Sequence, residues 1–128
     1  PYADNLNHAL QRMEGHFIRG YGDRSGNAEI RLMPGALEEA QAFLENNSEA
    51  EHHLERVKAL IEGFETPYGM ELLSTIHWIV THEPDNASSL EHLSERVAAW
   101  NHRKKQLMKP KHIHKAYARI EQQGWASA

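Results

Sequence analysis

The segment after Thr66-Pro67 constrains the fold most, because its apolar residues fall on most sides of a helix. They are Met70, Leu72, Leu73, Ile76, Trp78, Ile79 and Val80. A threonine followed by proline is a typical helix start, with the hydroxyl as N-cap and the proline at the first helical position. A helix that is apolar nearly all round is usually the central, buried one. We therefore expect the other elements to pack around this helix.

The flanking segments have the period of amphipathic helices. Helices are predicted from about Asp4 to Glu14, after Pro34, after the capping boxes Ser48–Glu51 and Ser88–Glu91, and from Pro110 to a stop at Gly124. The helix after Ser48 has one of the clearest apolar stripes. Its members are Ala50, Leu54, Val57, Ile61 and Phe64.

Two short strands are predicted at residues 17–21 and 28–32, joined by the polar, glycine-containing loop 22–27. Two strands alone are marginally stable, so this hairpin has to pack on helices. The predicted fold class is mainly α with a small β-hairpin (α+β), a compact bundle of about five to six helices. A chain of 128 residues is long enough for one hydrophobic core, which predicts a single domain over residues 1–128.

Composition narrows the class of protein. The chain has no cysteine, no signal-peptide pattern and no apolar run long enough to span a bilayer. These features predict a cytoplasmic location without membrane contact. The chain opens at Pro1-Tyr2 without an initiator methionine, so we expect a piece excised from a longer protein.

Signatures of catalysis and of metal binding are missing. Among the ten histidines, His112 and His114 are two residues apart and would diverge on a helix, which disfavours a metal site. His77, beside Trp78, is expected to be a hydrogen-bonded residue of the core. The Gly20-Tyr21-Gly22 stretch lies in the hairpin and lacks the strand-to-helix context of a phosphate loop. The sequence predicts no catalytic residue, no metal and no cofactor.

Charge is unevenly distributed along the chain. Residues 1–100 carry 17 acidic side chains against 7 Lys+Arg, whereas residues 101–128 carry Glu121 alone against 7 Lys+Arg. An acidic helical surface of this kind could steer towards a basic groove on a partner. Ordinary solubilising charge is the competing interpretation.

The basic end allows a second hypothesis. Amphipathic helices at 89–100 and 111–123, joined by a basic stretch, resemble a helix-turn-helix or a winged-helix half that could hold nucleic acid through phosphates. The candidate residues are Arg103, Lys104, Lys105, Lys111, Lys115 and Arg119. A basic face that balances the acidic remainder explains the same pattern. A scaffold that only self-associates is a third, weaker possibility.

Long motifs add a family resemblance. They are PYADNL with LQRMEGHFIRGYGDR, LIEGFETPYGMELL with IHW, WNHRKK, and Gly124-Trp125. Together they resemble the C-terminal region of DarG-type bacterial antitoxins, over essentially the whole chain. These antitoxins oppose DarT toxins, which ADP-ribosylate thymidine in single-stranded DNA. The family's N-terminal macro domain removes ADP-ribose from DNA, and nothing in this chain matches a macro domain.

The resemblance implies that this region binds the toxin directly, as a heterodimer, and blocks its DNA site by DNA mimicry. The family's opening continues a Tyr-Gly-Pro-Tyr motif, of which only Pro1-Tyr2 remain. Binding hot spots favour tyrosine, tryptophan and arginine. Residues in exposed loops are the best candidates for toxin contacts, because a partner can reach them. These candidates are Tyr21, Asp23, Arg24, Glu65, Tyr68 and Glu71.

Overall fold

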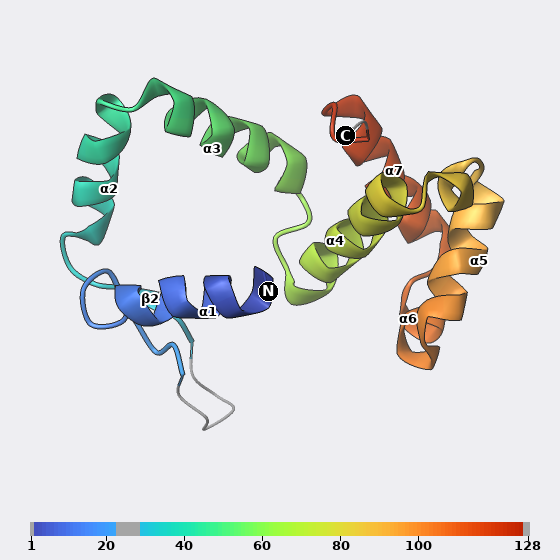
Figure 1. Ribbon diagram of the computed structural model, residues 1–128, viewed down its shortest axis with the longest axis horizontal. Coiled ribbons are helices and arrows are strands. Elements are labelled where there is room, and N and C mark those ends of the chain that lie inside the picture. Colours follow the sequence, from blue (N-terminus) through green and yellow to red (C-terminus); the bar gives the residue numbers. More distant parts are fainter. Residues whose placement is uncertain (1, 23–28, 127–128) are drawn as a thin grey trace. The chain divides into compact units, whose positions relative to one another are not determined.

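The computed structural model describes residues 2–22 and 29–126, so Asp23 and Arg24 lie outside the described residues. As predicted, the fold is mainly α with a two-stranded antiparallel hairpin (Figure 1). The elements are α1 (Tyr2–Met13), β1 (Ile18–Arg19), β2 (Arg31–Leu32), α2 (Ala36–Glu45), α3 (Ser48–Ile61), α4 (Pro67–His82), the 3-10 helix η1 (Pro84–Ala87), α5 (Leu90–Trp100), α6 (His102–Leu107) and α7 (Pro110–Gln122).

The chain divides into two compact units, where the sequence predicted one domain. Unit 1 is Pro1–His52 and unit 2 is His53–Ala128, with the division inside α3. The described residues form seven α-helices, where about five to six were predicted. The additional helix is α6, in the basic stretch after Trp100. Asn101 caps that helix, since its side-chain oxygen accepts a hydrogen bond from the Lys104 amide at 2.8 Å.

The hairpin of unit 1 is shorter than the sequence predicts. Ile18 pairs with Leu32, and Arg19 pairs with Arg31. The first strand ends there because the Glu14 carboxylate accepts hydrogen bonds from the amides of Gly20 and Tyr21, at 3.2 and 3.0 Å. Those two donors are therefore used by a side chain and not by a β-ladder.

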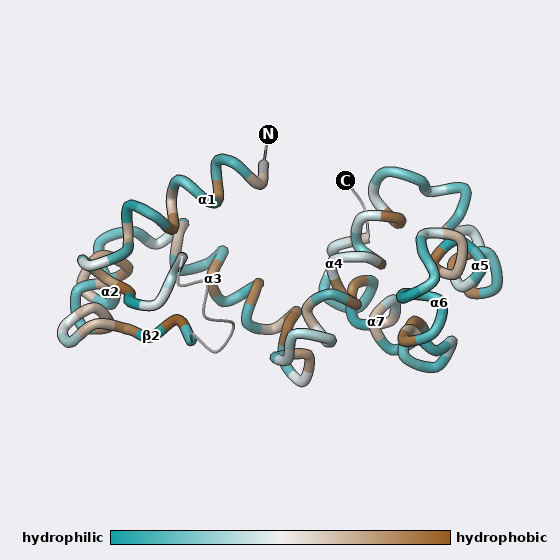
Figure 2. The backbone as a smooth tube through the Cα atoms, turned by 90° about the horizontal axis from the view of Figure 1, so that it is seen from below, coloured by the Kyte–Doolittle hydropathy of each residue, from teal (hydrophilic) through white to brown (hydrophobic). Residues whose placement is uncertain are grey.

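Unit 1 has a very small core. Among its described residues, the buried apolar side chains are Ile18 and Ala36. The large apolar side chains that remain exposed are Leu6, Met13, Phe17, Ile30, Leu32, Leu37 and Phe43. Hydrophobic positions are visible at β2 and in α2 in Figure 2. The apolar faces predicted for the helices of this unit are thus largely uncovered within it.

Unit 2 contains a continuous core around α4. Ile76 and Ile79 of α4 are fully buried, and α5 and α7 pack against them. The side chains that these two helices contribute are Leu93, Val97, Ile113, Ala116 and Ile120. The prediction of a central α4 is confirmed. The prediction that this helix is buried on nearly all sides is wrong for one face. Met70, Ser74 and Trp78, spaced four residues apart, are exposed.

Local signals set the helix ends. Thr66 caps α4 as predicted, accepting from the Gly69 amide at 2.9 Å. α5 is capped by Ser89, which accepts from the His92 amide at 3.1 Å, so the Ser88–Glu91 capping box is displaced by one residue. Gly124, at φ +75°, ends α7 as predicted. The amide of Trp125 then reaches back to the Ile120 carbonyl at 2.9 Å, which is a Schellman motif.

Other helix predictions change in detail. α3 begins at Ser48 itself, with the Glu51 amide bonded to the Asn47 carbonyl, so Ser48 is not outside the helix as a cap. His77 is half-buried, and its ring meets Trp125 edge-on at 6.1 Å. The described part of unit 2, residues 53–126, contains helices and no strand, so α5 and α7 have no wing there. No helix in the described part of the chain is both long and apolar enough to cross a membrane.

Candidate functional site

Tyr68, a predicted toxin contact, is used inside unit 2. Its hydroxyl donates to the Leu107 carbonyl at 3.1 Å and lies 2.8 Å from Nδ1 of His112. The hydroxyl has one hydrogen, which goes to the carbonyl, so Nδ1–H of His112 is the donor to Tyr68. Burial, and then the Glu71 carboxylate, raise the pKa of Tyr68. The residue therefore ties the start of α4 to the end of α6 and to α7.

Glu71, a second predicted contact, lies at the centre of an ionic cluster. Its carboxylate accepts from Arg103 and, at 2.8 Å, from the Lys104 ammonium. These two hydrogen bonds lower the pKa of Glu71 to about 2. Lys104 is buried and also donates to the Thr75 hydroxyl at 3.2 Å. Two residues predicted for nucleic-acid binding thus pair with one predicted for toxin binding.

Arg119, another member of the predicted nucleic-acid set, caps the end of α3. Its guanidinium donates to the carbonyls of Ala59 and Leu60, at 3.3 and 3.2 Å, and to the carbonyl of Glu62. The other members, Lys105, Lys111 and Lys115, are exposed. The six candidates therefore do not form one solvent-facing basic surface.

Tyr21 and Glu65 are placed differently. Tyr21 is half-buried, and its hydroxyl donates to the side-chain oxygen of Asn7 on α1. It borders a hollow of about 510 Å³ together with Asn7, Gln11, Glu14 and Gly22. Glu65 is exposed in the turn before α4. Within unit 1, Tyr21 is the predicted contact that the structure describes.

An apolar cleft in unit 1 was not predicted as a site. It has a volume of about 460 Å³ and is lined by Met13, Phe17, Glu39, Ala40, Phe43 and Leu44. Phe43 is 61% exposed, and Met13 and Phe17 are each 37% exposed. The sequence predicts that Ala40, Phe43 and Leu44 share one face of the helix after Pro34, and it gave no signal that Phe43 would remain exposed. An exposed apolar cleft with a carboxylate at its rim has the chemistry of a protein-binding surface.

Comparison with known proteins gives homologues of this chain. No protein-family model matches the chain. The DNA ADP-ribosyl glycohydrolase of Thermus aquaticus is 51% identical over 104 residues, which cover 81% of this chain and 28% of that protein. The proteins of the same name from Mycobacterium bovis and Mycobacterium tuberculosis are 33% identical over 127 residues, covering 94% of this chain and 36% of theirs. The chain is homologous to a segment of the DarG glycohydrolases.

The chain spans about a third of the length of these DarG relatives. It corresponds to a fragment of them and not to the catalytic macro domain. This partial match fits the C-terminal region of DarG that the sequence motifs resemble.

Sequence reasoning missed a second surface of this DarG segment, on unit 2. Trp78 is 46% exposed and Trp100 is 37% exposed. The two indoles border a hollow of about 420 Å³, whose other lining residues are Glu71, Ser74, Thr75 and Lys104. The available signal was the polar Ser74 one turn before Trp78, which marks a face of α4 that is not apolar.

The aromatic rings of this hollow are held by their neighbours. The Trp78 ring stacks on His82, with centroids 3.7 Å apart and planes at 12°. The Arg96 guanidinium and the Lys104 ammonium lie 5.3 and 5.4 Å from the Trp100 ring centre, within cation–π range. Arg96 is itself fixed by a bidentate pair with Glu83, at 2.5 and 2.9 Å.

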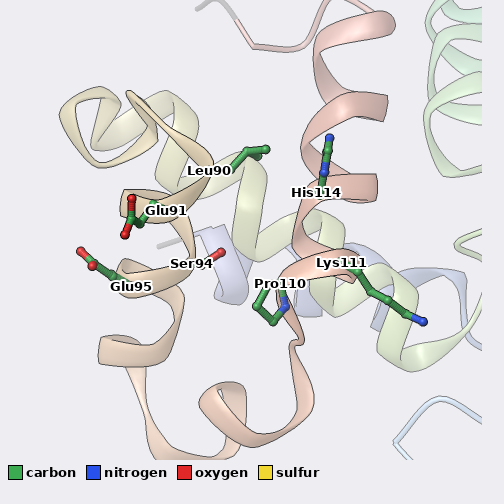
Figure 3. A pocket seen from close by; sticks show the side chains of 7 residues that line it. All are labelled: Leu90, Glu91, Ser94, Glu95, Pro110, Lys111 and His114. Carbon is green, nitrogen blue, oxygen red and sulfur yellow. The ribbon is translucent and has the colours of Figure 1, made fainter.

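A third hollow, of about 450 Å³, lies between α5 and α7 (Figure 3). Leu90 and Pro110 face it, and the Glu91 and Glu95 carboxylates lie on the α5 side, away from Lys111 on α7. Charges of opposite sign therefore border its two walls. No group of three or more His, Asp or Glu side chains among the described residues is placed to hold a metal ion.

Proposed function

We propose that this chain is the toxin-binding module of a DarG antitoxin. It forms a heterodimer with a DarT-like toxin and blocks the site where that toxin takes single-stranded DNA. The full-length protein then combines this module with a macro domain that removes ADP-ribose from DNA. Support comes from the homology to DNA ADP-ribosyl glycohydrolases, together with the long motifs of the sequence.

The observation that carries the proposal is the uncovered apolar surface of unit 1. Seven large apolar side chains of its described residues are exposed, including Phe17 and Phe43 at the cleft. Monomeric soluble proteins rarely leave large contiguous apolar patches in water, and such patches usually mark an interaction site. A protein partner that inserts apolar side chains into the cleft would supply the burial that unit 1 lacks.

The charge of unit 1 indicates which groups the partner presents around its own apolar side chains. Residues 1–52 carry nine Asp+Glu against four Lys+Arg, and Glu39 lies at the cleft itself. A protein that grips single-stranded DNA presents basic groups along a groove. A carboxylate-rich surface competes for such a groove and accelerates association through complementary potential. This is the physical content of DNA mimicry by the module.

The test measures toxin activity. Purified cognate toxin is assayed for ADP-ribosylation of a thymidine-containing single-stranded oligonucleotide while this chain is titrated in. We expect inhibition at about one equivalent, and undiminished modification at large excess would refute the proposal. Because hot-spot truncations cost about 2 kcal/mol or more, Phe43→Ala should raise the concentration needed for inhibition by roughly thirtyfold.

A matched control separates the cleft from general apolar loss. Val57→Ala removes a side chain that is also exposed, at 39%, but belongs to unit 2. It should inhibit the toxin as the unaltered chain does. Equal loss of inhibition by the two variants would show that the cleft is not the toxin-binding surface.

A further inference from the structure

We propose that the hollow between Trp78 and Trp100 in unit 2 is a binding site for single-stranded nucleic acid. This site is distinct from the apolar cleft in unit 1 and does not depend on the proposed toxin contact. The ligand class is a flexible strand whose bases stack on an indole and whose phosphates meet basic side chains. Three observations support the assignment: an open aromatic face, cations fixed beside it, and a basic helix at its border.

Trp78 provides the stacking face. One side of its ring is covered by His82, in a nearly parallel stack. The residue is nevertheless 46% exposed and borders the hollow, so the ring has a free surface there. The His82 ring is bonded through Nδ1 to the Thr81 hydroxyl at 2.8 Å and to the Trp78 carbonyl at 3.1 Å. An indole held in this way loses little side-chain freedom when a base stacks on it.

Trp100 also borders the hollow and has two cations beside its ring. Lys104 lies 5.4 Å from the Trp100 ring centre and is fixed by Glu71 and Thr75. Arg96, at 5.3 Å from the same ring, is fixed by Glu83. The volume of about 420 Å³ falls in the range of small-ligand sites. This part of the hollow is therefore shaped in advance and does not have to be ordered on binding.

The local charge favours an anionic strand. The Glu71 carboxylate, which borders the hollow, is paired with Arg103 and Lys104, and Glu83, outside its lining, is paired with Arg96. Arg103, whose side chain is 61% exposed, and the exposed Lys105 continue the basic surface along α6. Aromatic faces bordered by basic side chains are the usual arrangement for single-stranded nucleic acid. A protein partner would find the more favourable apolar surface on unit 1.

The experiment titrates the full chain with two unstructured oligonucleotides, oligothymidylate and oligouridylate, each about 12 nucleotides long. Anisotropy of a labelled strand and quenching of intrinsic tryptophan fluorescence report binding. We expect dissociation constants in the roughly 1–100 µM range at physiological salt, typical of sequence-independent binding. The two strands distinguish DNA from RNA, and binding of either supports the site. No binding of either strand would overturn the proposal.

Variants locate the site. Trp78→Ala should weaken binding about tenfold or more, because loss of one base–aromatic stack has an effect of this size. The affinity of Trp78→Phe, which keeps a smaller stacking ring, should fall between those of the unaltered chain and Trp78→Ala. Lys105→Ala should lower the slope of log affinity against log salt by about 0.7. Circular dichroism establishes that each variant retains its helices.

Met70→Ala is the matched control, because Met70 lies on the same face of α4, is 44% exposed and does not border the hollow. It should bind the strands as the unaltered chain does. A similar loss for Met70→Ala and Trp78→Ala would reduce the effect to general hydrophobic contact and overturn the site. So would a Trp78→Ala variant with full strand affinity but weakened toxin binding, since the hollow would then belong to a protein interface. None of the strand-binding measurements uses the toxin, so they can fail while the proposed function holds.

Discussion

Units 1 and 2 are built from similar amphipathic helices but differ in what covers them. In unit 2, the apolar side chains of α4, α5 and α7 meet in one continuous core. In unit 1, α1 and α2 carry apolar residues at helical spacing, yet most of these side chains remain exposed. Amphipathic spacing therefore predicts that a helix forms and which face is apolar. It does not predict whether that face is covered by the same chain or by a partner.

The difference also separates two kinds of surface. Unit 1 combines an apolar cleft with an excess of acidic residues, whereas unit 2 has nine Asp+Glu against ten Lys+Arg and exposes aromatic rings beside fixed cations. A unit with its own core can hold its side chains in place before a ligand binds. A unit with little core depends on the energy of binding for its order. All three tryptophans lie in unit 2, so their fluorescence reports the unfolding of that unit.

The largest expected contrast between the units comes from apolar truncation. Ile76→Ala removes a fully buried side chain from the centre of unit 2 and should lower the free energy of unfolding by about 3 kcal/mol. Phe43→Ala, in unit 1, should change it by less than about 0.5 kcal/mol, because that side chain is already exposed to water. Urea titrations followed by tryptophan fluorescence and by far-ultraviolet circular dichroism measure both. A destabilisation by Phe43→Ala comparable to that of Ile76→Ala would show that unit 1 has a core of its own.

A smaller effect is expected in the first turn of α4, at Gly69. A Cβ on Gly69 would lie 2.4 Å from the Phe64 carbonyl oxygen and 2.8 Å from its carbon, and these are backbone atoms that cannot move aside easily. Gly69→Ala should destabilise unit 2 by about 2 kcal/mol and shift the tryptophan transition accordingly.

Gly15→Ala is the comparison in unit 1. Apart from Gly15 and its chain neighbours, the described residues place no atom within 4 Å of the position of its Cβ. The expected cost is therefore the backbone strain of a φ of +79°, about 1 kcal/mol. The tryptophan transition should not respond to it. Unaltered stability of Gly69→Ala would show that the close approach of α4 to Phe64 is not required in unit 2.

Sequence reasoning succeeded where local chemistry decides the structure. The Thr66 cap, the Gly124 stop and the helical class follow from residues that act over one turn. It failed where distant residues decide. Nothing in the sequence indicated that Glu71 would be shared by Arg103 and Lys104, because these partners are about 30 residues away along the chain and meet only after α6 packs on α4.

The candidate sites illustrate the same limit. Tyr68 and Glu71 were proposed as exposed hot spots from their place at a helix start, whereas their polar groups bond inside unit 2. Arg119 was one of a row of basic residues, and its guanidinium binds the carbonyls at the end of α3. Trp78 was expected in the core because the apolar residues of its helix fall on most sides. Whether a side chain turns inwards depends on the packing angle of its helix, which a single helix pattern does not specify.

The smallest expected effect concerns acid and tests how firmly α4 and α6 are joined. The pKa of Glu71 is about 2 in the folded chain, below its ordinary value of 4.5. The Glu71 ion pairs therefore contribute their full stability above about pH 4.5 and lose it as the pH falls towards 2.

Glu71→Gln should cost about 1 kcal/mol at pH 7, a modest amount because Arg103 is largely exposed. Urea midpoints from tryptophan fluorescence should then converge for the two chains as the pH approaches 2. Glu65→Gln, at an exposed position in the turn before α4, is the control, and its urea midpoint at pH 7 should match that of the unaltered chain. A constant gap between Glu71→Gln and the unaltered chain from pH 7 to 2 would mean that packing, and not the charge on Glu71, joins α4 to α6.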